Sequence, residues 1–159
     1  MEPIPEVNLI KVRSAEEMYN ATLENLPVDV AIFSAAVSDY KVKNKENEKI
    51  KKKDFMNLNL EKNPDILANI SKHNSLRPKI VIGFAAETNN LNKNSKKKLS
   101  EKNCDWIIAN KVSDKSIGFD SDFNEVSIFY KNNSIEKIPK MKKSLLADQI
   151  VSKVIYYLN

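Results

Sequence analysis

Three short stretches of the sequence carry residue types that commonly bind ligands. SAAVSDY (residues 34–40) follows an apolar run and places small side chains before the carboxylate of Asp39. GFAAET (residues 83–88) follows a second apolar run and offers the ring of Phe84, and a third run ends in the polar side chain of Asn110. Small residues admit a flat ligand close to the backbone, and an aromatic ring can stack on a base. On spacing alone, core packing explains each stretch at least as well.

A run of lysines lies between the first two of these stretches. Residues 41–53 hold seven lysines and two glutamates, a surplus of +5 that equals the formal charge of the whole chain. An RNA-binding surface is one interpretation, and it predicts an affinity that falls steeply with salt. However, only two of the 26 basic residues are arginines, and Tyr40 and Phe55 flank the run rather than alternate with its lysines. Arginine makes most bidentate base contacts and stacking needs interleaved aromatics, so we expect no nucleic-acid partner.

Two further lysines, Lys98 and Lys102, are four residues apart on a predicted helix. That spacing places them on one helix face, where both can reach one polyphosphate. The plain alternative is the solvated face of a lysine-rich helix, and spacing alone favours it by about two to one. The chain has two glycines, so it holds neither a Walker A loop nor a G-x-G-x-x-G turn. A bound nucleotide would therefore need its phosphates held by lysines and helix N-termini.

Composition excludes several other classes of protein. Cys104 is the only cysteine and His73 the only histidine, so we expect no disulfide framework and no cysteine- or histidine-rich metal site. Cys104 precedes a predicted strand and is expected to be a buried apolar residue, and His73 is expected to be a helix-end or solvent-exposed side chain. No run of about 18 apolar residues exists and the N-terminus is acidic, so we expect a cytoplasmic protein with no membrane partner.

The elements that must position these residues alternate between strands and helices. Ser14, with Glu17 three residues later, is a capping box that predicts a helix start, and Asn63 is expected to cap the helix that begins at Pro64. Three apolar runs, at 28–37, 79–87 and 105–112, predict strands buried on both faces. The full set of expected strands is 7–12, 28–37, 54–63, 79–87 and 105–112, with a hairpin over 124–139 turning at Asn132-Asn133, and the expected helices are 13–26, 64–73, 90–103 and 142–159.

This alternation predicts an α/β fold. We expect a Rossmann-like, mostly parallel sheet flanked by helices, interrupted by the lysine-rich stretch and ending in a β-hairpin and a helix. In such sheets, ligands gather at the carboxyl ends of the strands. The loops that follow Ala36, Gly83 and Asn110 are therefore expected to form the site together.

Six motifs occur in order along the chain: AAVSDY (35–40), KIKK (49–52), NPDIL (63–67), RPKIVIGFAAET (77–88), the Lys98 and Lys102 pair, and DWIIANKV (105–112). In that order they closely resemble the C-terminal part of phosphopantothenate–cysteine ligase. This is the synthetase half of the bifunctional coenzyme A biosynthesis flavoprotein of bacteria, phosphopantothenoylcysteine decarboxylase/synthetase. One short motif would mean little, but six in sequence over nearly the whole chain are specific.

The resemblance implies a CTP-dependent ligation in coenzyme A biosynthesis, in which 4′-phosphopantothenate is activated as an acyl-cytidylate and then joined to cysteine. It implies Lys49 as the catalytic lysine and Mg²⁺ as the ion that accompanies CTP, with no metal ligand identified in the chain. Phe84 would lie by the cytosine, and two lysines would hold the triphosphate. The implied nucleotide-binding residues are Ala35, Ala36, Asp39, Pro64, Asp65, Ile66, Leu67, Phe84, Lys98 and Lys102.

The resemblance also implies missing parts. The family's glycine- and serine-rich N-terminal portion, which supplies an asparagine for the acyl-cytidylate, has no match here, and neither does the flavin decarboxylase domain. Residues 1–159 are interpreted as one partial ligase domain without flavin. The lysine-rich stretch resembles an extended arm that reaches towards the partner's active site in a homodimer, and a separate decarboxylase or N-terminal ligase polypeptide is a further expected partner. The alternative is a non-catalytic nucleotide-binding or regulatory module on the same scaffold.

Overall fold

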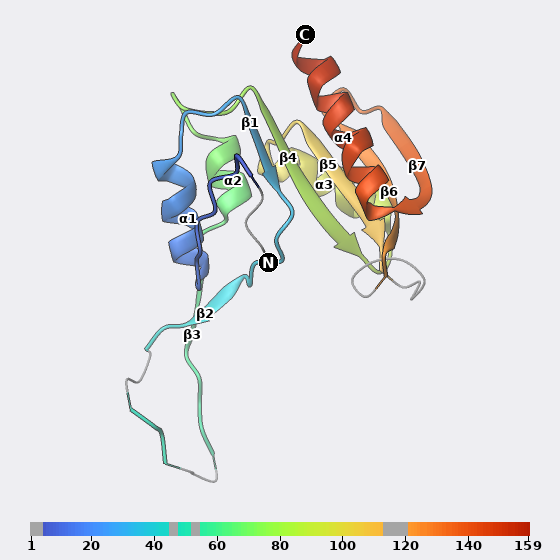
Figure 1. The fold of residues 1–159 in the computed structure, drawn as a ribbon. Helices are drawn as coiled ribbons and strands as arrows, with labels where there is room; N and C mark the ends of the chain where they lie inside the picture. Colours follow the sequence, from blue (N-terminus) through green and yellow to red (C-terminus); the bar gives the residue numbers. More distant parts are fainter. Residues whose placement is uncertain (1–4, 45–47, 52–54, 113–120) are drawn as a thin grey trace.

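The computed structural model describes residues 5–44, 48–51, 55–112 and 121–159. Within these residues the main sheet has five strands in the order β1-β4-β5-β6-β7, and β2 and β3 form a separate two-stranded sheet (Figure 1). The elements are α1 (Ala15–Glu24), β1 (Val30–Phe33), β2 (Tyr40–Val42), β3 (Leu60–Lys62), α2 (Ile66–Ser71), β4 (Ile80–Glu87), α3 (Leu91–Lys102), β5 (Trp106–Lys111), β6 (Phe123–Tyr130), β7 (Ile135–Lys142) and α4 (Lys143–Leu158).

The main sheet combines a parallel part with an antiparallel hairpin. β1 pairs with β4 and β4 pairs with β5, both in parallel, so the carboxyl ends of these three strands lie at one edge. β6 pairs antiparallel with β5, and β7 with β6. The turn between β6 and β7 contains Asn133 at φ 68°, a conformation that asparagine tolerates better than most residues. The predicted α/β fold is confirmed, and because the hairpin extends the same sheet, that sheet is mixed.

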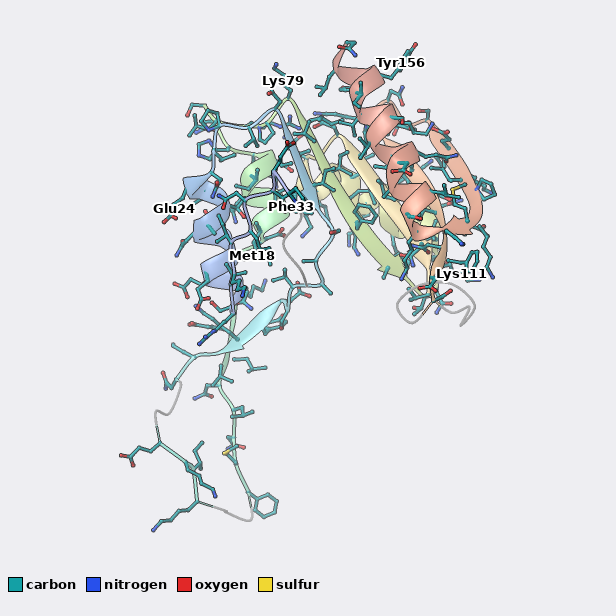
Figure 2. All side chains as sticks on the ribbon, in the orientation of Figure 1. Met18, Glu24, Phe33, Lys79, Lys111 and Tyr156 are labelled. Carbon is teal, nitrogen blue, oxygen red and sulfur yellow. The ribbon has the colours of Figure 1, made fainter. Side chains whose placement is uncertain are left out.

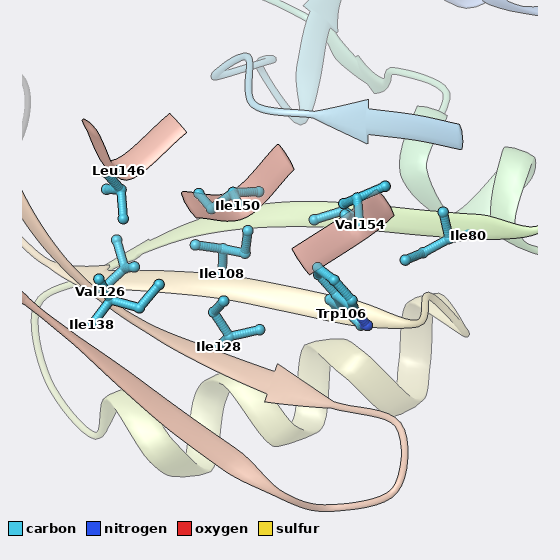
Figure 3. Packing of buried hydrophobic residues seen from close by; sticks show 10 residues of the cluster. Ile80, Trp106, Ile108, Val126, Ile128, Ile138, Leu146, Ile150 and Val154 are labelled. Atoms are coloured by element: carbon cyan, nitrogen blue, oxygen red, sulfur yellow. The ribbon is translucent and has the colours of Figure 1, made fainter. Parts of the chain in front are cut away.

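The two faces of the sheet are buried by different helices. Successive strand residues point to opposite faces, so Val81 and Ile107 pack on one face with Leu99 of α3. Their neighbours in sequence face α4 on the other side, in the larger cluster drawn in Figure 3. That cluster contains Ile80, Ile82, Trp106, Ile108, Val126, Ile128, Ile138, Leu146, Ile150 and Val154. Because both faces of β4 and β5 are covered, the prediction that these two strands are buried on both sides is confirmed.

The helix starts follow from local hydrogen bonds. The Ser14 hydroxyl accepts from the Glu17 N–H at 3.1 Å, and the Glu17 carboxylate reaches back to the Arg13 N–H at 2.7 Å, which confirms the predicted capping of α1. At α2, the prediction that Asn63 is the cap is wrong. Asp65 caps this helix instead, accepting from the Ala68 N–H at 3.0 Å, because the Asn63 side chain is used elsewhere.

Two expected strands that precede the arm are corrected. Residues 7–12 form no strand, because the structure pairs them with no described strand. The strand predicted over 28–37 covers only Val30–Phe33 and is not buried on both faces. β1 is the edge of the main sheet, and Ile32 keeps 44% of its surface exposed. An apolar run is therefore compatible with an edge strand as well as a central one.

The lysine-rich stretch belongs to an arm that extends away from the main sheet (Figure 1). Its base is the antiparallel pair of β2 and β3, with Tyr40 opposite Lys62. The strand predicted over 54–63 forms only at Leu60–Lys62; Asp54 lies outside the described residues, and Phe55 is 91% exposed. The predicted arm is confirmed as an extended element that carries exposed apolar side chains.

The remaining predictions on single residues concern Cys104 and His73. Cys104 is fully buried, and burial raises the pKa of its thiol to about 11, which fits an inert core residue. His73 lies just after α2, where its Nδ1 accepts from the Leu76 N–H at 3.1 Å. His73 thus closes a turn at a helix end, as expected.

Candidate functional site

A pocket of about 450 Å³ opens at the carboxyl end of β1. Residues from α1, β1, the turn before α2, β4 and α3 line this pocket, which we call the strand-end pocket. Met18 of α1 and Phe33 of β1, both labelled in Figure 2, belong to its wall. Eight of the eleven predicted site residues line it: Ala35, Asp39, Pro64, Asp65, Ile66, Leu67, Phe84 and Lys102. Motifs separated by up to about 65 residues in sequence thus meet at one place.

Asn63 joins two of these motifs. Its backbone N–H donates to the Asp39 carbonyl at 2.9 Å, and its side-chain amide donates to the Ser38 carbonyl at 2.8 Å. These two bonds fix the start of NPDIL against the end of AAVSDY. Asp65 then caps the start of α2, so the turn at residues 63–65 is held by hydrogen bonds at both of its ends. The sequence predicted that Asn63 caps the helix, whereas it bonds to the end of AAVSDY. Its position at the start of NPDIL was the signal that could have pointed to this role.

Gly83 lies beneath the strand-end pocket, in close contact with α2. A Cβ at this position would stand 2.5 Å from Leu67 Cδ2 and 3.1 Å from Ile107 Cδ1. The space beside Gly83 is therefore filled by Leu67, which in turn lines the pocket. Phe84, the next residue, is partly buried against the α4-side core and lines the pocket with part of its ring.

A second pocket of about 460 Å³ shares Ser34, Ala35 and Phe84 with the first and is completed by α4. Ala36 lies in this second pocket, as does Asn110 at the end of β5. The small residues that follow β1 therefore form a partition with space on both sides. Lys143 also lines this pocket, and sequence reasoning missed it because none of the six motifs extends into the C-terminal helix.

The two predicted phosphate-binding lysines lie on one face of α3 but contact different carboxylates. Lys102 lines the strand-end pocket and pairs with Asp65, the cap of α2. Lys98, one turn earlier, pairs with Glu87 at 2.8 Å and lies outside the pocket lining. Both ammonium groups are thus turned towards the start of α2 and the end of β4. The shared face is as predicted, whereas neither carboxylate partner was predicted.

Glu87 is the last residue of β4 and its side chain is only 11% exposed. Burial acts to raise the pKa of this carboxyl, but hydrogen bonds from Lys98 and Asn94 outweigh burial and hold the pKa below its usual value. The Asn94 amide donates to Glu87 Oε2 at 2.8 Å. The carboxylate is therefore ionised at neutral pH and matched by a cation.

Lys49 is not brought to the strand-end pocket. It is an exposed residue of the arm and lines neither that pocket nor its neighbour across the partition. The KIKK motif also runs beyond Lys51 into a residue outside the described ranges. Lys49 is thus the one predicted site residue that lies in the arm. Its predicted catalytic role stays a prediction.

Other features of the described residues point away from a different site. No group of three or more His, Cys, Asp or Glu side chains in this part of the chain could hold a metal ion. Another hollow, of about 1650 Å³, runs along α4 and the β6–β7 hairpin, and none of the predicted residues lines it. Of the three carboxylates in its lining, Glu136 accepts from the Tyr130 hydroxyl and from Lys153, both at 2.6 Å, and Asp105 pairs with Arg77. None of the helices described is both long enough and apolar enough to cross a membrane.

The mixed sheet flanked by helices defines an α/β domain, and in such domains ligands commonly bind at the carboxyl ends of the parallel strands, where this pocket lies. The chain belongs to the family of DNA/pantothenate metabolism flavoprotein C-terminal domains, whose sequence model matches residues 1–157. This confirms the resemblance drawn from the six motifs.

The relatives share most of this chain but are much longer. It is 44% identical over 154 residues to the coenzyme A biosynthesis bifunctional protein CoaBC of Borreliella burgdorferi and 41% identical over 151 residues to that of Haemophilus influenzae. Each alignment covers 94% of this chain but only 38% and 37% of the respective relative. The chain therefore spans less than two fifths of the length of these relatives.

Solved structures agree with the fold. The crystal structure of the C-terminal domain of a CoaBC protein matches with a TM-score of 0.76 at 30% identity, covering 99% of this chain and 71% of that one. The DNA/pantothenate metabolism flavoprotein from Streptococcus pneumoniae matches with a TM-score of 0.77 at 24% identity, which bears on the fold alone. Part of each solved chain thus has no counterpart here.

Proposed function

We propose that this chain is the nucleotide-binding side of a CTP-dependent phosphopantothenate–cysteine ligase acting in the cytoplasm. In the first step the carboxylate of 4′-phosphopantothenate attacks the α-phosphorus of CTP, forming an acyl-cytidylate and releasing pyrophosphate. In the second step the amine of cysteine attacks the acyl carbon, forming the amide and releasing CMP and a proton. The observation that carries the proposal is the convergence of eight predicted residues on the strand-end pocket.

The pocket suits the base and phosphates of a nucleotide. Phe84 and Leu67 supply apolar surface for a pyrimidine, and Lys102 supplies a cation at the rim. Lys98, on the same helix face, extends the positive charge towards the carboxyl edge of the sheet. Positive charge stabilises the pyrophosphate as it leaves, since negative charge develops on its oxygens in the transition state.

Magnesium is proposed to enter with CTP rather than to occupy a site of its own. The described residues contain no carboxylate cluster that suits a resident ion, and Mg²⁺ commonly keeps several waters while it is held by substrate phosphates. Asp39, the acidic residue of the AAVSDY motif, lines the pocket.

Lys49 is proposed to act from the arm, and the arm is proposed to meet a second copy of the chain in a homodimer. Lys49 is an exposed residue of the arm that does not line the strand-end pocket, so it needs a surface against which the arm can settle. The arm carries exposed apolar side chains at Phe55, Met56 and Leu58, and such side chains favour contact with another protein surface.

The acyl side of the reaction is proposed to come from polypeptide outside this sequence. β1 is an edge strand of the main sheet as described, so its outer backbone edge could pair with an additional strand, and the 44% exposed Ile32 shows that one of its faces is not fully covered. The glycine- and serine-rich ligase portion expected from the family is the proposed occupant of that edge. The flavin decarboxylase domain, present in the bifunctional relatives, is the other proposed partner.

Titration with CTP and with ATP tests the nucleotide assignment. We expect CTP to bind more tightly, and equal affinities would contradict the roles proposed for Phe84 and the Pro64–Leu67 turn. Catalysis needs the remaining ligase portion, so it should be supplied in trans or by a full-length fusion, with pyrophosphate release as the assay. In that complete enzyme Lys49→Gln should abolish ligation while leaving CTP affinity within a factor of about three of wild type.

A non-catalytic nucleotide-binding module is the second candidate. The position of Lys49 away from the pocket favours it, because binding alone does not require that residue. The complete-enzyme assay separates the two candidates. CTP binding without pyrophosphate release in the presence of both acyl substrates would favour the module.

A further inference from the structure

Glu87 occupies a position that the proposed chemistry does not yet use. It ends β4 at the carboxyl edge of the sheet, and its side chain is 11% exposed. One carboxylate oxygen lies 2.8 Å from Lys98 Nζ, and the other accepts from the Asn94 amide at 2.8 Å. The last residue of β4 thus holds two side chains of α3, those of Lys98 and Asn94.

A second bond makes this arrangement more rigid. The Asn94 amide also donates to the Asn89 carbonyl at 3.1 Å, in the turn that joins β4 to α3. The backbone carbonyl of Glu87 accepts from the Val112 N–H at 3.1 Å, which ties the end of β4 to the end of β5. Glu87 is therefore fixed through its backbone as well as its side chain.

The other lysine pairs of α3 are more exposed. Lys97 reaches Glu101 at 3.8 Å on the solvent side, with side chains 69% and 58% exposed. Lys102 pairs with Asp65, whose side chain is 44% exposed. Lys98 is the lysine whose partner is buried and belongs to the sheet. A buried partner confines an ammonium group more strongly than a solvated one, because an unpaired buried carboxylate is costly.

We propose that Glu87 is a positioning residue that holds Lys98 for the phosphates of the nucleotide. This inference rests on the proposed function, since it concerns the phosphate side of the same site. Lysine is a flexible side chain with several rotatable bonds, and a phosphate-binding lysine that is already held loses less freedom when it binds. Lys98 lies one helical turn from Lys102 on the same face of α3. A triphosphate that extends from Lys102 towards the edge of the sheet would therefore reach Lys98 next.

The ammonium group of Lys98 keeps capacity for a ligand. It has three N–H donors, and its nitrogen lies 2.8 Å from one Glu87 oxygen as an ion pair. Its side chain is 42% exposed, so the other donors can face a phosphate without breaking the pair. Glu87 therefore acts through Lys98 and does not itself contact the nucleotide.

The experiment compares Glu87→Gln with the matched variant Glu101→Gln, which removes the exposed partner of Lys97 on the same helix. Competitive acetylation followed by mass spectrometry measures the reactivity of each lysine without any nucleotide. We expect the reactivity of Lys98 to rise about threefold in E87Q and to stay unchanged in E101Q, because a lost charge-assisted hydrogen bond frees the amine. Unchanged Lys98 reactivity in E87Q would overturn the proposal.

Isothermal titration then measures CTP and cytidine binding to the same proteins. E87Q should weaken CTP binding about tenfold, the effect of one charge-assisted hydrogen bond, and leave cytidine binding unchanged. A Lys98→Gln variant should weaken CTP to a similar extent, and adding E87Q to it should cause less than about a twofold further loss, because coupled residues are not additive.

The outcomes separate this inference from the proposed function. A wild-type chain that binds no CTP overturns the proposed function and the phosphate role of Lys98 together. CTP binding to wild type with equal affinity in E87Q overturns only the role of Glu87. Parallel loss of CTP and cytidine binding, or independent losses in the double variant, would show a general structural role and would also overturn it.

Discussion

The two ends of the parallel strands use ion pairs in different ways. At the amino end, Arg77 donates to the carbonyls of Ser71, Pro78 and Asn103 at 2.8–3.2 Å and to Asp105 at 2.9 Å. Asp105 also accepts from the Val81 N–H at 2.7 Å. At the carboxyl end, by contrast, each α3 lysine discussed above has a single carboxylate partner and part of its surface open to solvent.

The difference shows which cations are available for a ligand. The planar guanidinium of Arg77 spreads its donors over several backbone groups, so it fixes loops together and has little left to offer. An ammonium group with one partner retains donors, and lysine's compact charge suits phosphate. The Arg77 cluster at the amino end is therefore committed to holding the fold, whereas Lys98 and Lys102 at the carboxyl end keep donors that a ligand could use. Four changes test this contrast.

The largest effect on stability should come from Arg77→Ala. It removes the partner of Asp105, whose side chain is 10% exposed, and takes one donor away from each of three backbone carbonyls, of which that of Ser71 keeps the Asn103 amide. Breaking a largely buried pair in this way costs about 3–5 kcal/mol in the free energy of unfolding. Urea unfolding followed by circular dichroism measures the loss. Lys79→Ala is the control at the same end of the sheet, since its pair with Asp29 is exposed and is expected to contribute about 0.5 kcal/mol or less. Similar losses for both variants would mean that burial and the number of partners do not set what an ion pair contributes.

The next largest effect should come from Gly83→Ala, at the floor of the strand-end pocket. The added methyl group would stand 2.5 Å from Leu67 Cδ2, so the Leu67 side chain or α2 must shift. Overpacking of this kind costs about 1–3 kcal/mol. The double variant with Leu67→Ala should lose less stability than the sum of the two single variants, as thermal unfolding can measure. Strict additivity would mean that the two residues are not in contact.

The sequence predicted which residues meet at the strand-end pocket better than it predicted the edges of the fold. Continuous apolar runs mark the strands and parallel pairing brings their carboxyl ends together, so Asp39 and Phe84 could be expected near each other, whereas Lys102 was placed with them by the family resemblance. The strand predicted over 7–12 and the two-sided burial predicted over 28–37 were wrong. An apolar pattern indicates a tendency to be buried but does not say which element does the burying. That neighbour is a tertiary contact, which local patterns do not contain.

Side-chain partners were the other gap. The N-cap of α2 was placed at Asn63, because Asn63 and Asp65 are both good capping residues and only the fold decides which one is free. The pairing of Lys98 with Glu87 joins residues on different elements, so the i,i+4 spacing of the lysines gave no sign of it. Lys49 is the opposite case, since its assignment rests on a motif and the arm leaves it away from the pocket.

A smaller effect should separate the ion pairs by pH. The pKa of Glu87 is lowered in the folded chain relative to an ordinary glutamate near 4.3. Its pair with Lys98 therefore stabilises the folded state above that ordinary value, and the contribution disappears as the pH falls through the lower folded-state pKa. Lys98→Met should cost about 1 kcal/mol at pH 7 and progressively less below about pH 4, measured by unfolding at each pH. A cost that does not change with pH would show that packing, and not charge, is responsible.

The smallest effect on stability should come from Asp65→Asn, and it bears most directly on which cation is exchangeable. Asparagine caps a helix about as well as aspartate, so the free energy of unfolding should change by less than about 0.5 kcal/mol, whereas Asp65→Ala should lose about 1 kcal/mol with the cap. Both variants remove the negative charge beside Lys102. If Lys102 leaves Asp65 when phosphate arrives, both should bind CTP about two- to threefold more tightly at low salt, because a competing anion is gone. Weaker binding in Asp65→Asn would instead mean that Asp65 holds Lys102 in place as Glu87 holds Lys98, and the two lysines would then be alike.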